Sequence, residues 1–98
     1  MATGTIKNSN LLSNILTRTV TVQISYLAAV TGSGSADATL SNYDIVGIVG
    51  ITLANPTTNN LTSADITNNT ITVYLNRTNG QTFEGSSTAD VTILYAKR

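Results

Sequence analysis

The amino-acid sequence predicts an all-β domain, an antiparallel β-sandwich of about five to seven strands with a short N-terminal arm or helix. The first observation is composition: 18 Thr, 11 Asn and 9 Ser stand against only 10 charged residues. Thr favours strands, whereas Asn, Ser and Gly favour turns. The second is that several segments alternate apolar and polar residues with period two, as half-buried strands do. The length of 98 residues fits one small domain.

The first sixteen residues differ from the rest and are predicted to form an arm, residues 1–16, ahead of a sandwich domain, residues 17–98. Leu11, Leu12, Ile15 and Leu16 have helical spacing and follow Asn and Ser residues suited to cap a helix. A helix of about two turns is marginal alone. The arm therefore packs on its own domain, docks on a partner or is a disordered tail.

Three segments read as strands. Residues 17–30 begin with strict alternation, and residues 70–77 and 88–98 alternate again. The segments between them read as connections: "TGSGSAD" (31–37) as a flexible loop, "NPTTNNLTSADITNN" (55–69) as a second loop, and Asn79-Gly80 as a tight turn. The expected core faces are Val20, Val22, Ile24 and Tyr26; Ile71, Val73 and Leu75; and Ala89, Val91, Ile93 and Tyr95.

The segment "YDIVGIVGITLA" (43–54) is the most apolar in the chain and does not alternate. Strict period two places Ile45, Gly47, Val49 and Ile51 on one face and Val46, Ile48 and Gly50 on the other. A strand that is apolar on both faces should be buried on both faces. We therefore predict that Ile45, Val46, Gly47, Ile48, Val49, Gly50 and Ile51 form an oligomer interface. A phosphate-clamping GxxG loop is the alternative, but it lacks flanking basic residues.

Composition argues against most chemistry. The chain has no Cys and no His, which removes thiol and imidazole catalysis and the usual zinc sites. The five carboxylates show no calcium-loop spacing and are expected to be solvated or to cap turns, with a surface calcium as the alternative. The sequence thus predicts no enzyme, no metal and no cofactor.

Charge and hydropathy also limit the partners. Net charge is zero, so we expect neither nucleic acid nor a membrane surface as a partner. No signal peptide and no apolar run of membrane-spanning length is seen. Tyrosine is most of the aromatic content, and aromatic rings bind sugars. Tyr26 and Tyr95 have core parity, so Tyr43 and Tyr74 are the candidate glycan contacts.

Two segments carry a family resemblance. "SNYDIVGIVGI" (41–51) and the closing "ITVYLNRTNGQTFEGSSTADVTILYAKR" (71–98) resemble small β-sandwich domains of phage tail-fibre and virion appendage or decoration proteins. More loosely, the chain is similar to the H-type lectin sandwich, whose sugar-contacting residues have no counterparts here. The resemblance covers about residues 18–98 and consists of packing residues.

The resemblance implies a non-enzymatic virion structural protein, made in the host bacterial cytoplasm and commonly trimeric. Sixteen leading residues are too few for a fibre shaft, which favours a capsid decoration, head-fibre or small tail appendage subunit. In that role the arm would dock on other virion proteins and the apolar strand would join the copies into a homo-oligomer, a trimer being favoured. A glycan-binding module that recognises a host surface is the alternative function.

Overall fold

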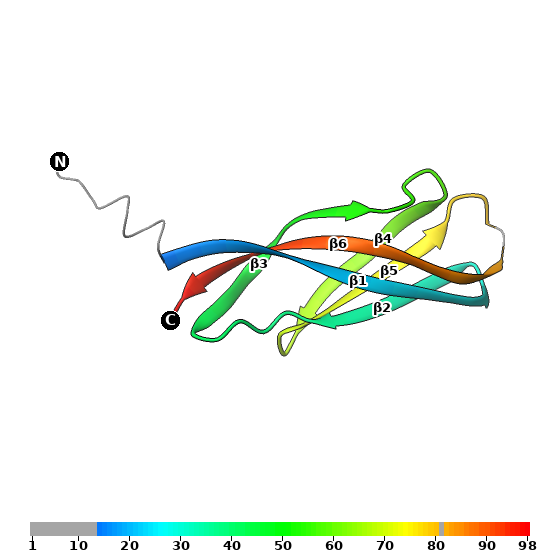
Figure 1. Cartoon of the computed structure of the whole chain (residues 1–98). Coiled ribbons are helices and arrows are strands. Elements are labelled where there is room, and N and C mark those ends of the chain that lie inside the picture. The colour runs from blue at the N-terminus through cyan, green and yellow to red at the C-terminus, as the bar shows by residue number, and fades with distance from the viewer. Residues whose placement is uncertain (1–13, 81) are drawn as a thin grey trace.

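The computed structural model describes residues 14–80 and 82–98, which form one six-stranded sheet (Figure 1). All neighbouring strands are antiparallel, and their order across the sheet is β3-β6-β1-β2-β5-β4. The strands are β1 (Ile15–Ala29), β2 (Thr31–Asp37), β3 (Tyr43–Leu53), β4 (Asn59–Thr67), β5 (Thr70–Arg77) and β6 (Phe83–Lys97).

The prediction of an all-β, antiparallel domain with five to seven strands is confirmed. The architecture differs from a sandwich, because the six strands belong to one continuous sheet and not to two separate ones. This sheet curls around its apolar face until the outermost strands, β3 and β4, come into contact (Figure 1). The result is a nearly closed, barrel-like sheet in which β3 and β4 are edge strands.

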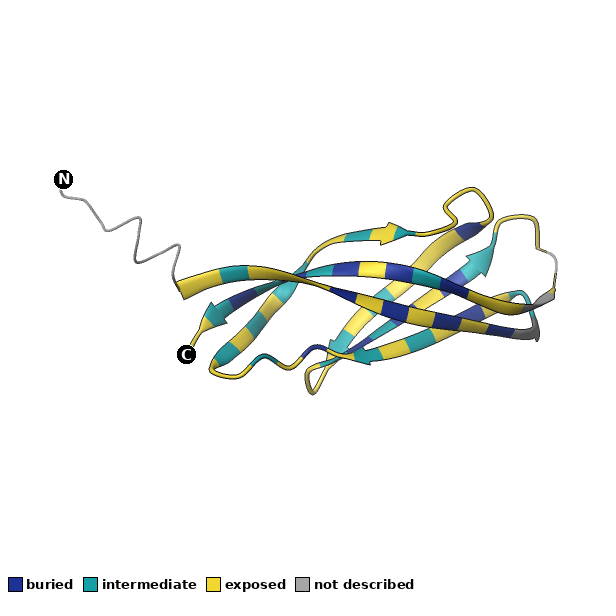
Figure 2. Cartoon of the chain, in the orientation of Figure 1, coloured by how far each residue is buried: buried dark blue, intermediate teal, exposed yellow. Residues whose placement is uncertain are grey.

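The core lies on the inner face of the curled sheet. Burial alternates along β1 and β6, the two long central strands (Figure 2). The three core faces expected from the alternation are confirmed, since each of their eleven side chains is at most 8% exposed. Ala38, in the connection from β2 to β3, completes the buried cluster. Strands that are wet on one face and buried on the other show the clearest sequence signal, which explains this agreement.

Two segments expected to be loops contain strands. Residues 31–37 form β2, which pairs with β1 and β5, and residues 59–67 form β4. The glycines of β2 suggested a loop, but Gly34 is a glycine for a different reason. A Cβ built at Gly34 would lie 1.8 Å from the backbone oxygen of Gln23 on β1. Glycine is therefore needed for close approach of two strands, and does not mark a loop at this position.

The turn from β4 to β5 consists of Asn68 and Asn69. Both residues have positive φ, 52° and 63°, and Thr67 pairs with Thr70 directly across the turn. Positive φ at both central residues is the mark of a type I′ turn, which Asn tolerates better than most residues. The Asn-Asn pair is thus a hairpin turn and not the end of a long loop.

The start of the sheet also differs from expectation. Ile15 and Leu16 are the first residues of β1, paired with Ala96 and Tyr95 of β6, so they belong to the sheet and not to a helical arm. Leu16 packs against the core. Leu11 and Leu12 lie outside the described residues, and the arm remains a prediction there.

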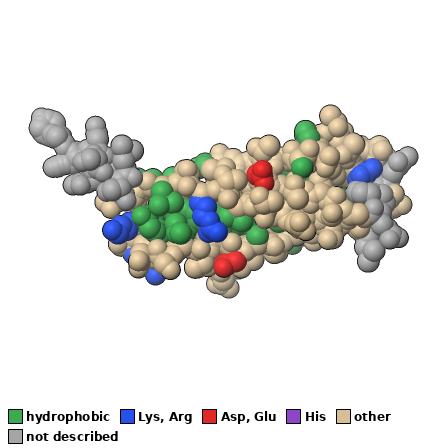
Figure 3. Space-filling model, viewed as in Figure 1, with side chains coloured by type: hydrophobic (Ala, Val, Ile, Leu, Met, Phe, Trp, Pro, Cys, Tyr) green, Lys and Arg blue, Asp and Glu red, His purple; other side chains and the backbone are tan. Residues whose placement is uncertain are grey.

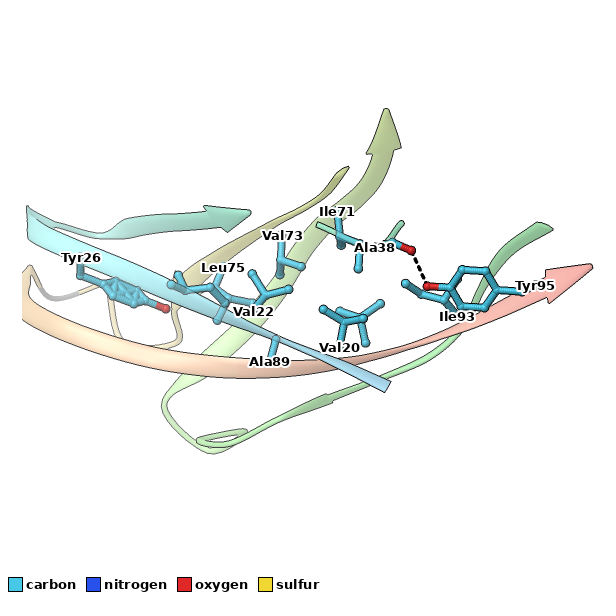
Figure 4. Close-up of a cluster of buried hydrophobic side chains, with 12 residues drawn as sticks. Val20, Val22, Tyr26, Ala38, Ile71, Val73, Leu75, Ala89, Ile93 and Tyr95 are labelled. Atoms are coloured by element: carbon cyan, nitrogen blue, oxygen red, sulfur yellow. Dashed lines mark hydrogen bonds between the residues drawn. The ribbon is translucent and has the colours of Figure 1, made fainter. Parts of the chain in front are cut away.

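Two tyrosine side chains at opposite ends of the core, Tyr26 and Tyr95, each donate a hydrogen bond through the hydroxyl group (Figure 4). The Tyr26 hydroxyl donates to Asn59 Oδ1 at 2.6 Å, which joins β1 to edge strand β4. The Tyr95 hydroxyl donates to the Ala38 carbonyl oxygen, also at 2.6 Å, which holds the β2–β3 connection. Each bond satisfies a buried polar atom and links a peripheral part of the fold, edge strand β4 or the β2–β3 connection, to a central strand.

The molecule is long and thin, with principal extents of 58 × 24 × 15 Å. Its radius of gyration is 17.0 Å, whereas a compact domain of this length has about 13 Å. Much of each strand's outer face is therefore surface, and the outer face is where a binding site has to be sought.

Candidate functional site

The register of β3 explains its unusual sequence. Ile45, Ile48 and Ile51 lie opposite Tyr95, Ile93 and Val91 of β6. The seven residues 45–51 of β3 thus lie along the five residues 91–95 of β6, because the register shifts once between Ile45 and Gly47 and again between Ile48 and Gly50. Each shift is a β-bulge that inserts one extra residue. The repeated Ile-Val-Gly triplet therefore has a structural period of three.

The two bulges place every isoleucine of the triplets against the core. Ile45, Ile48 and Ile51 are half-buried and pack on the core cluster. The predicted faces were wrong for two residues: Ile48 points inward and Val49 outward, because strict alternation does not survive a bulge. Val46 and Val49 are the inserted residues.

Val46 and Val49 are the most exposed large hydrophobic side chains of the described chain, at 61% and 58%. Gly47 and Gly50 lie beside these valines and leave open space on the surface, because a Cβ built at either glycine would meet no atom within 4 Å. Neither glycine is needed for close packing within a single chain. The outer surface of β3 therefore alternates protruding valines with open gaps.

Neighbouring strands extend this apolar surface. Gly47 lies beside Leu94 of β6, which is on the outer face because Ile93 and Tyr95 face the core. Ala96 follows on the same face and pairs with Ile15 of β1, which is 44% exposed. We call the five side chains together the outer patch: Ile15, Val46, Val49, Leu94 and Ala96.

Sequence reasoning missed the part of the outer patch that lies outside β3. A signal existed in the run Ile93-Leu94-Tyr95-Ala96, which is apolar at both parities, as β3 is. Hydrophobic side chains also reach the surface, beside basic ones, near the end of the molecule where β1 begins and β6 ends (Figure 3).

Charged groups lie at both ends of the outer patch. At one end the Arg98 Nε donates to Asp44 Oδ1 at 2.8 Å, and both side chains are more than 60% exposed. At the other end the Thr21 hydroxyl donates to Asp90 Oδ1 at 2.8 Å. Such exposed pairs stabilise the fold little. They give the apolar surface a polar rim, with the Arg98–Asp44 ion pair at one end and the Asp90 carboxylate at the other.

The two candidate glycan contacts differ in exposure. Tyr43, the first residue of β3, directly follows a turn, is half-buried and packs against the core, so less of its ring is open to a ligand and its role as a glycan contact stays a prediction. Tyr74 is 44% exposed on the outer face of β5, between Ser33 of β2 and Ser63 of β4. Tyr74 is therefore an aromatic ring flanked by hydroxyl groups on an open surface.

The polar clusters of the sheet have structural partners. Asn59 donates to the Asn55 carbonyl oxygen, and Ser87 donates to Asn55 Oδ1, so the β3–β4 connection is fixed to β6. The Asp37 carboxylate accepts one hydrogen bond from the Thr39 hydroxyl and a second from the Thr39 backbone N–H. These hydrogen bonds, the hydroxyl's first, lower the pKa of the Asp37 carboxyl group. Both arrangements hold connections in place.

Among residues 14–80 and 82–98, no three His, Cys, Asp or Glu side chains lie close enough together to hold a metal ion. A helix with the length and hydrophobicity to span a membrane is likewise missing from this part of the chain. Comparison with known protein families, with curated proteins and with solved structures gave no match. The outer patch and Tyr74 are thus the two features on which a function can be argued.

Proposed function

We propose that the protein is a non-enzymatic structural subunit of a phage virion that associates with copies of itself through β3. The role is that of a capsid decoration, head-fibre or small tail appendage subunit. The observation that carries the self-association is the pair of outward valines, Val46 and Val49, beside the open positions at Gly47 and Gly50.

Bulges end or redirect an edge strand, and a soluble monomer carries polar side chains at the bulged positions of such a strand. Here both inserted residues are valines. Burying the exposed part of each stabilises an association by about 1 kcal/mol, roughly half of the value for a fully exposed valine. With Leu94, Ala96 and Ile15 the surface has the mixture of apolar centre and polar rim that is typical of subunit interfaces.

The virion assignment is supported by the resemblance of residues 41–51 and 71–98 to virion appendage domains. The outer faces of β1 and β6 fit it, since their hydroxyl groups bind one another, as Thr19 and Thr92 do at 3.1 Å. A surface with satisfied hydroxyls and few charges needs no counterions and suits a protein displayed at high density.

Co-sedimentation with virus particles tests the proposal. Purified protein is mixed with particles of the phage that encodes it, stripped of the native copies, and the pelleted fraction is measured against a bystander protein. We expect saturable binding at a fixed number of copies per particle. No binding to any virion component, together with a monomeric mass, would overturn the proposal.

A glycan-binding module is the second candidate, and Tyr74 favours it. The exposed ring between Ser33 and Ser63 offers a stacking face with hydroxyl groups on both sides. Binding to host cell-wall glycans is measured for the wild type and for Tyr74→Ala, with Thr72→Ala on the same strand as the matched control. Loss of binding in Tyr74→Ala alone supports this function, and the absence of binding by the wild type removes it.

A further inference from the structure

The outer surface of β3 is self-complementary about Ile48. Counting outward from Ile48, Gly47 is matched by Val49 on the other side, and Val46 is matched by Gly50. A protruding valine on one side thus corresponds to an open position on the other. Both valines are more than half exposed, and both glycines face empty space. Turning a second copy end over end about Ile48 therefore places each valine over a glycine.

We propose that two copies pack outer face to outer face about a two-fold axis that passes close to Ile48. Val46 then fills the space over Gly50 of the partner subunit, and Val49 fills the space over Gly47 of the partner subunit. This inference rests on the proposed self-association and names its partner, a second copy of this chain, and its register. Such an isologous contact closes on itself and cannot extend into a filament.

Packing of faces is favoured over pairing of edges. The two bulges twist β3 and disturb its regular ladder, which is how proteins prevent one edge strand from hydrogen-bonding to another. The side chains inserted by the same bulges point away from the core and are free to meet an opposing sheet. Glycine opposite valine also lets the two backbones approach closely, as in other close strand contacts.

The charges at the rim agree with this axis. At one end of the outer patch Arg98 is ion-paired with Asp44 of β3, and at the other end Asp90 pairs in the sheet with Thr52 of β3. Since Asp44 and Thr52 are equally far from Ile48, the rotation brings the Arg98 end of one copy over the Asp90 end of the partner subunit. The Arg98–Asp44 ion pair of one copy then faces Asp90 of the partner subunit, whereas a parallel orientation would place the two Asp90 carboxylates over each other, and like charges oppose such a contact.

Cysteine cross-linking tests the register without background, because the natural sequence has no cysteine. Asp44→Cys and Thr52→Cys, at exposed positions equally far from Ile48, are purified separately, shown to keep the wild-type melting temperature and solution mass, and treated with a short bis-maleimide, alone and after mixing. In the proposed packing Asp44 of one copy lies directly over Thr52 of the partner subunit. The two Asp44 positions are about 20 Å apart along the strands, since the pairing partners of Asp44 and Thr52 on β6, Ala96 and Asp90, are separated by six residue spacings of about 3.3 Å each.

We expect a cross-linked dimer in the mixture and several-fold less in either variant alone. A mixture of Asp44→Cys and Val46→Cys is the off-register control, because Val46 lies more than four residue spacings of β6 away from Thr52, and it should cross-link as little as the single variants. Efficient cross-linking of Asp44→Cys alone would overturn the two-fold register in favour of a parallel or three-fold contact. An oligomeric mass with no cross-link in any combination would refute this register yet leave the proposed self-association standing, whereas a monomeric mass would refute both.

Discussion

Substitution of Gly34 by alanine gives the sharpest test of how the sheet is built. Gly34 lies on β2, beside β1, and its φ is not in the left-handed region, so alanine meets no conformational strain there. The difficulty is space. An added Cβ would lie 1.8 Å from the Gln23 carbonyl oxygen and 2.7 Å from its carbonyl carbon. Both are backbone atoms, which cannot move aside as a flexible side chain can.

The size of the effect follows from these distances. Ordinary contact begins near 3.4 Å, so β1 and β2 have to separate by roughly 1.6 Å at this point (3.4 minus 1.8). A shift of that size breaks about two ladder hydrogen bonds at about 1 kcal/mol each and adds overpacking of about 1–3 kcal/mol. We expect a loss of about 3–5 kcal/mol in the free energy of unfolding, or a melting temperature lower by about 15–25 °C.

The assay is thermal unfolding followed by circular dichroism, with urea unfolding for the free energy. Ser33→Ala is the matched control, because it changes a small, exposed side chain on the same strand at a position that already carries a Cβ. We expect Ser33→Ala to leave the melting temperature nearly unchanged, as substitutions of exposed surface residues usually do. Equal melting temperatures for Gly34→Ala and the wild type would refute the argument that close strand approach explains the glycine-rich β2.

Four further outcomes are expected, from three variants. Tyr26→Phe should cost about 1–3 kcal/mol in urea unfolding, because Asn59 Oδ1 loses its buried donor. Burial raises the pKa of the Tyr26 hydroxyl, and the positive charge of Arg77 lowers it by a smaller amount. The stability that depends on the neutral hydroxyl is therefore present below pH 10.0, the ordinary value, and is lost as the pH rises through the higher pKa of the folded state. Tyr26→Phe has no such hydroxyl and should lose less stability at alkaline pH. The lowered pKa of Asp37 has the opposite sign: its contribution is present above pH 3.8 and is lost as pH falls, and acid unfolding of Thr39→Val should show a smaller loss. Gly47→Val should leave a single chain folded but weaken association, measured by solution mass; an unchanged mass would mean that Gly47 lies outside the interface.

Strands with one wet and one buried face were predictable from the sequence. Val20 to Tyr26 and Ala89 to Tyr95 alternate without interruption, and all of their inward side chains are buried. The strict period survives because these central strands pair in one regular register along most of their length. The folded structure therefore keeps the alternation of apolar and polar residues that the sequence shows in these two strands.

The errors have specific physical causes. Residues 31–37 read as a loop because Gly and Ser usually mark loops, whereas here Gly34 is required by a neighbouring backbone. The faces of β3 were misassigned because bulges at Val46 and Val49 change the period from two to three, and a bulge depends on pairing with β6. Register is a property of two strands together, so neither strand's sequence reveals it alone.

The location of the candidate interface was partly predictable. The apolar run from Ile45 to Ile51 directed attention to β3, the strand with the most exposed valines of the described residues, but it did not separate the core isoleucines from the outward valines. Ile15 was expected in a helix and lies on β1 at the edge of the outer patch. Residues that join a surface from three strands can be recognised only once the strand order is known.

The solution mass of the protein, measured by light scattering across a dilution series, tests the proposed subunit interface most directly. The wild type is compared with Val46→Ser/Val49→Ser and with Tyr74→Ser, which removes an exposed side chain from a strand outside the outer patch. We predict an oligomer for the wild type and for Tyr74→Ser, and an affinity weakened at least about a hundredfold for the double variant, since four valines per pair of copies lose their burial. A wild-type protein that is monomeric at every concentration, or a double variant that associates as tightly as the wild type, would contradict the central claim that the outer face of β3 is a subunit interface.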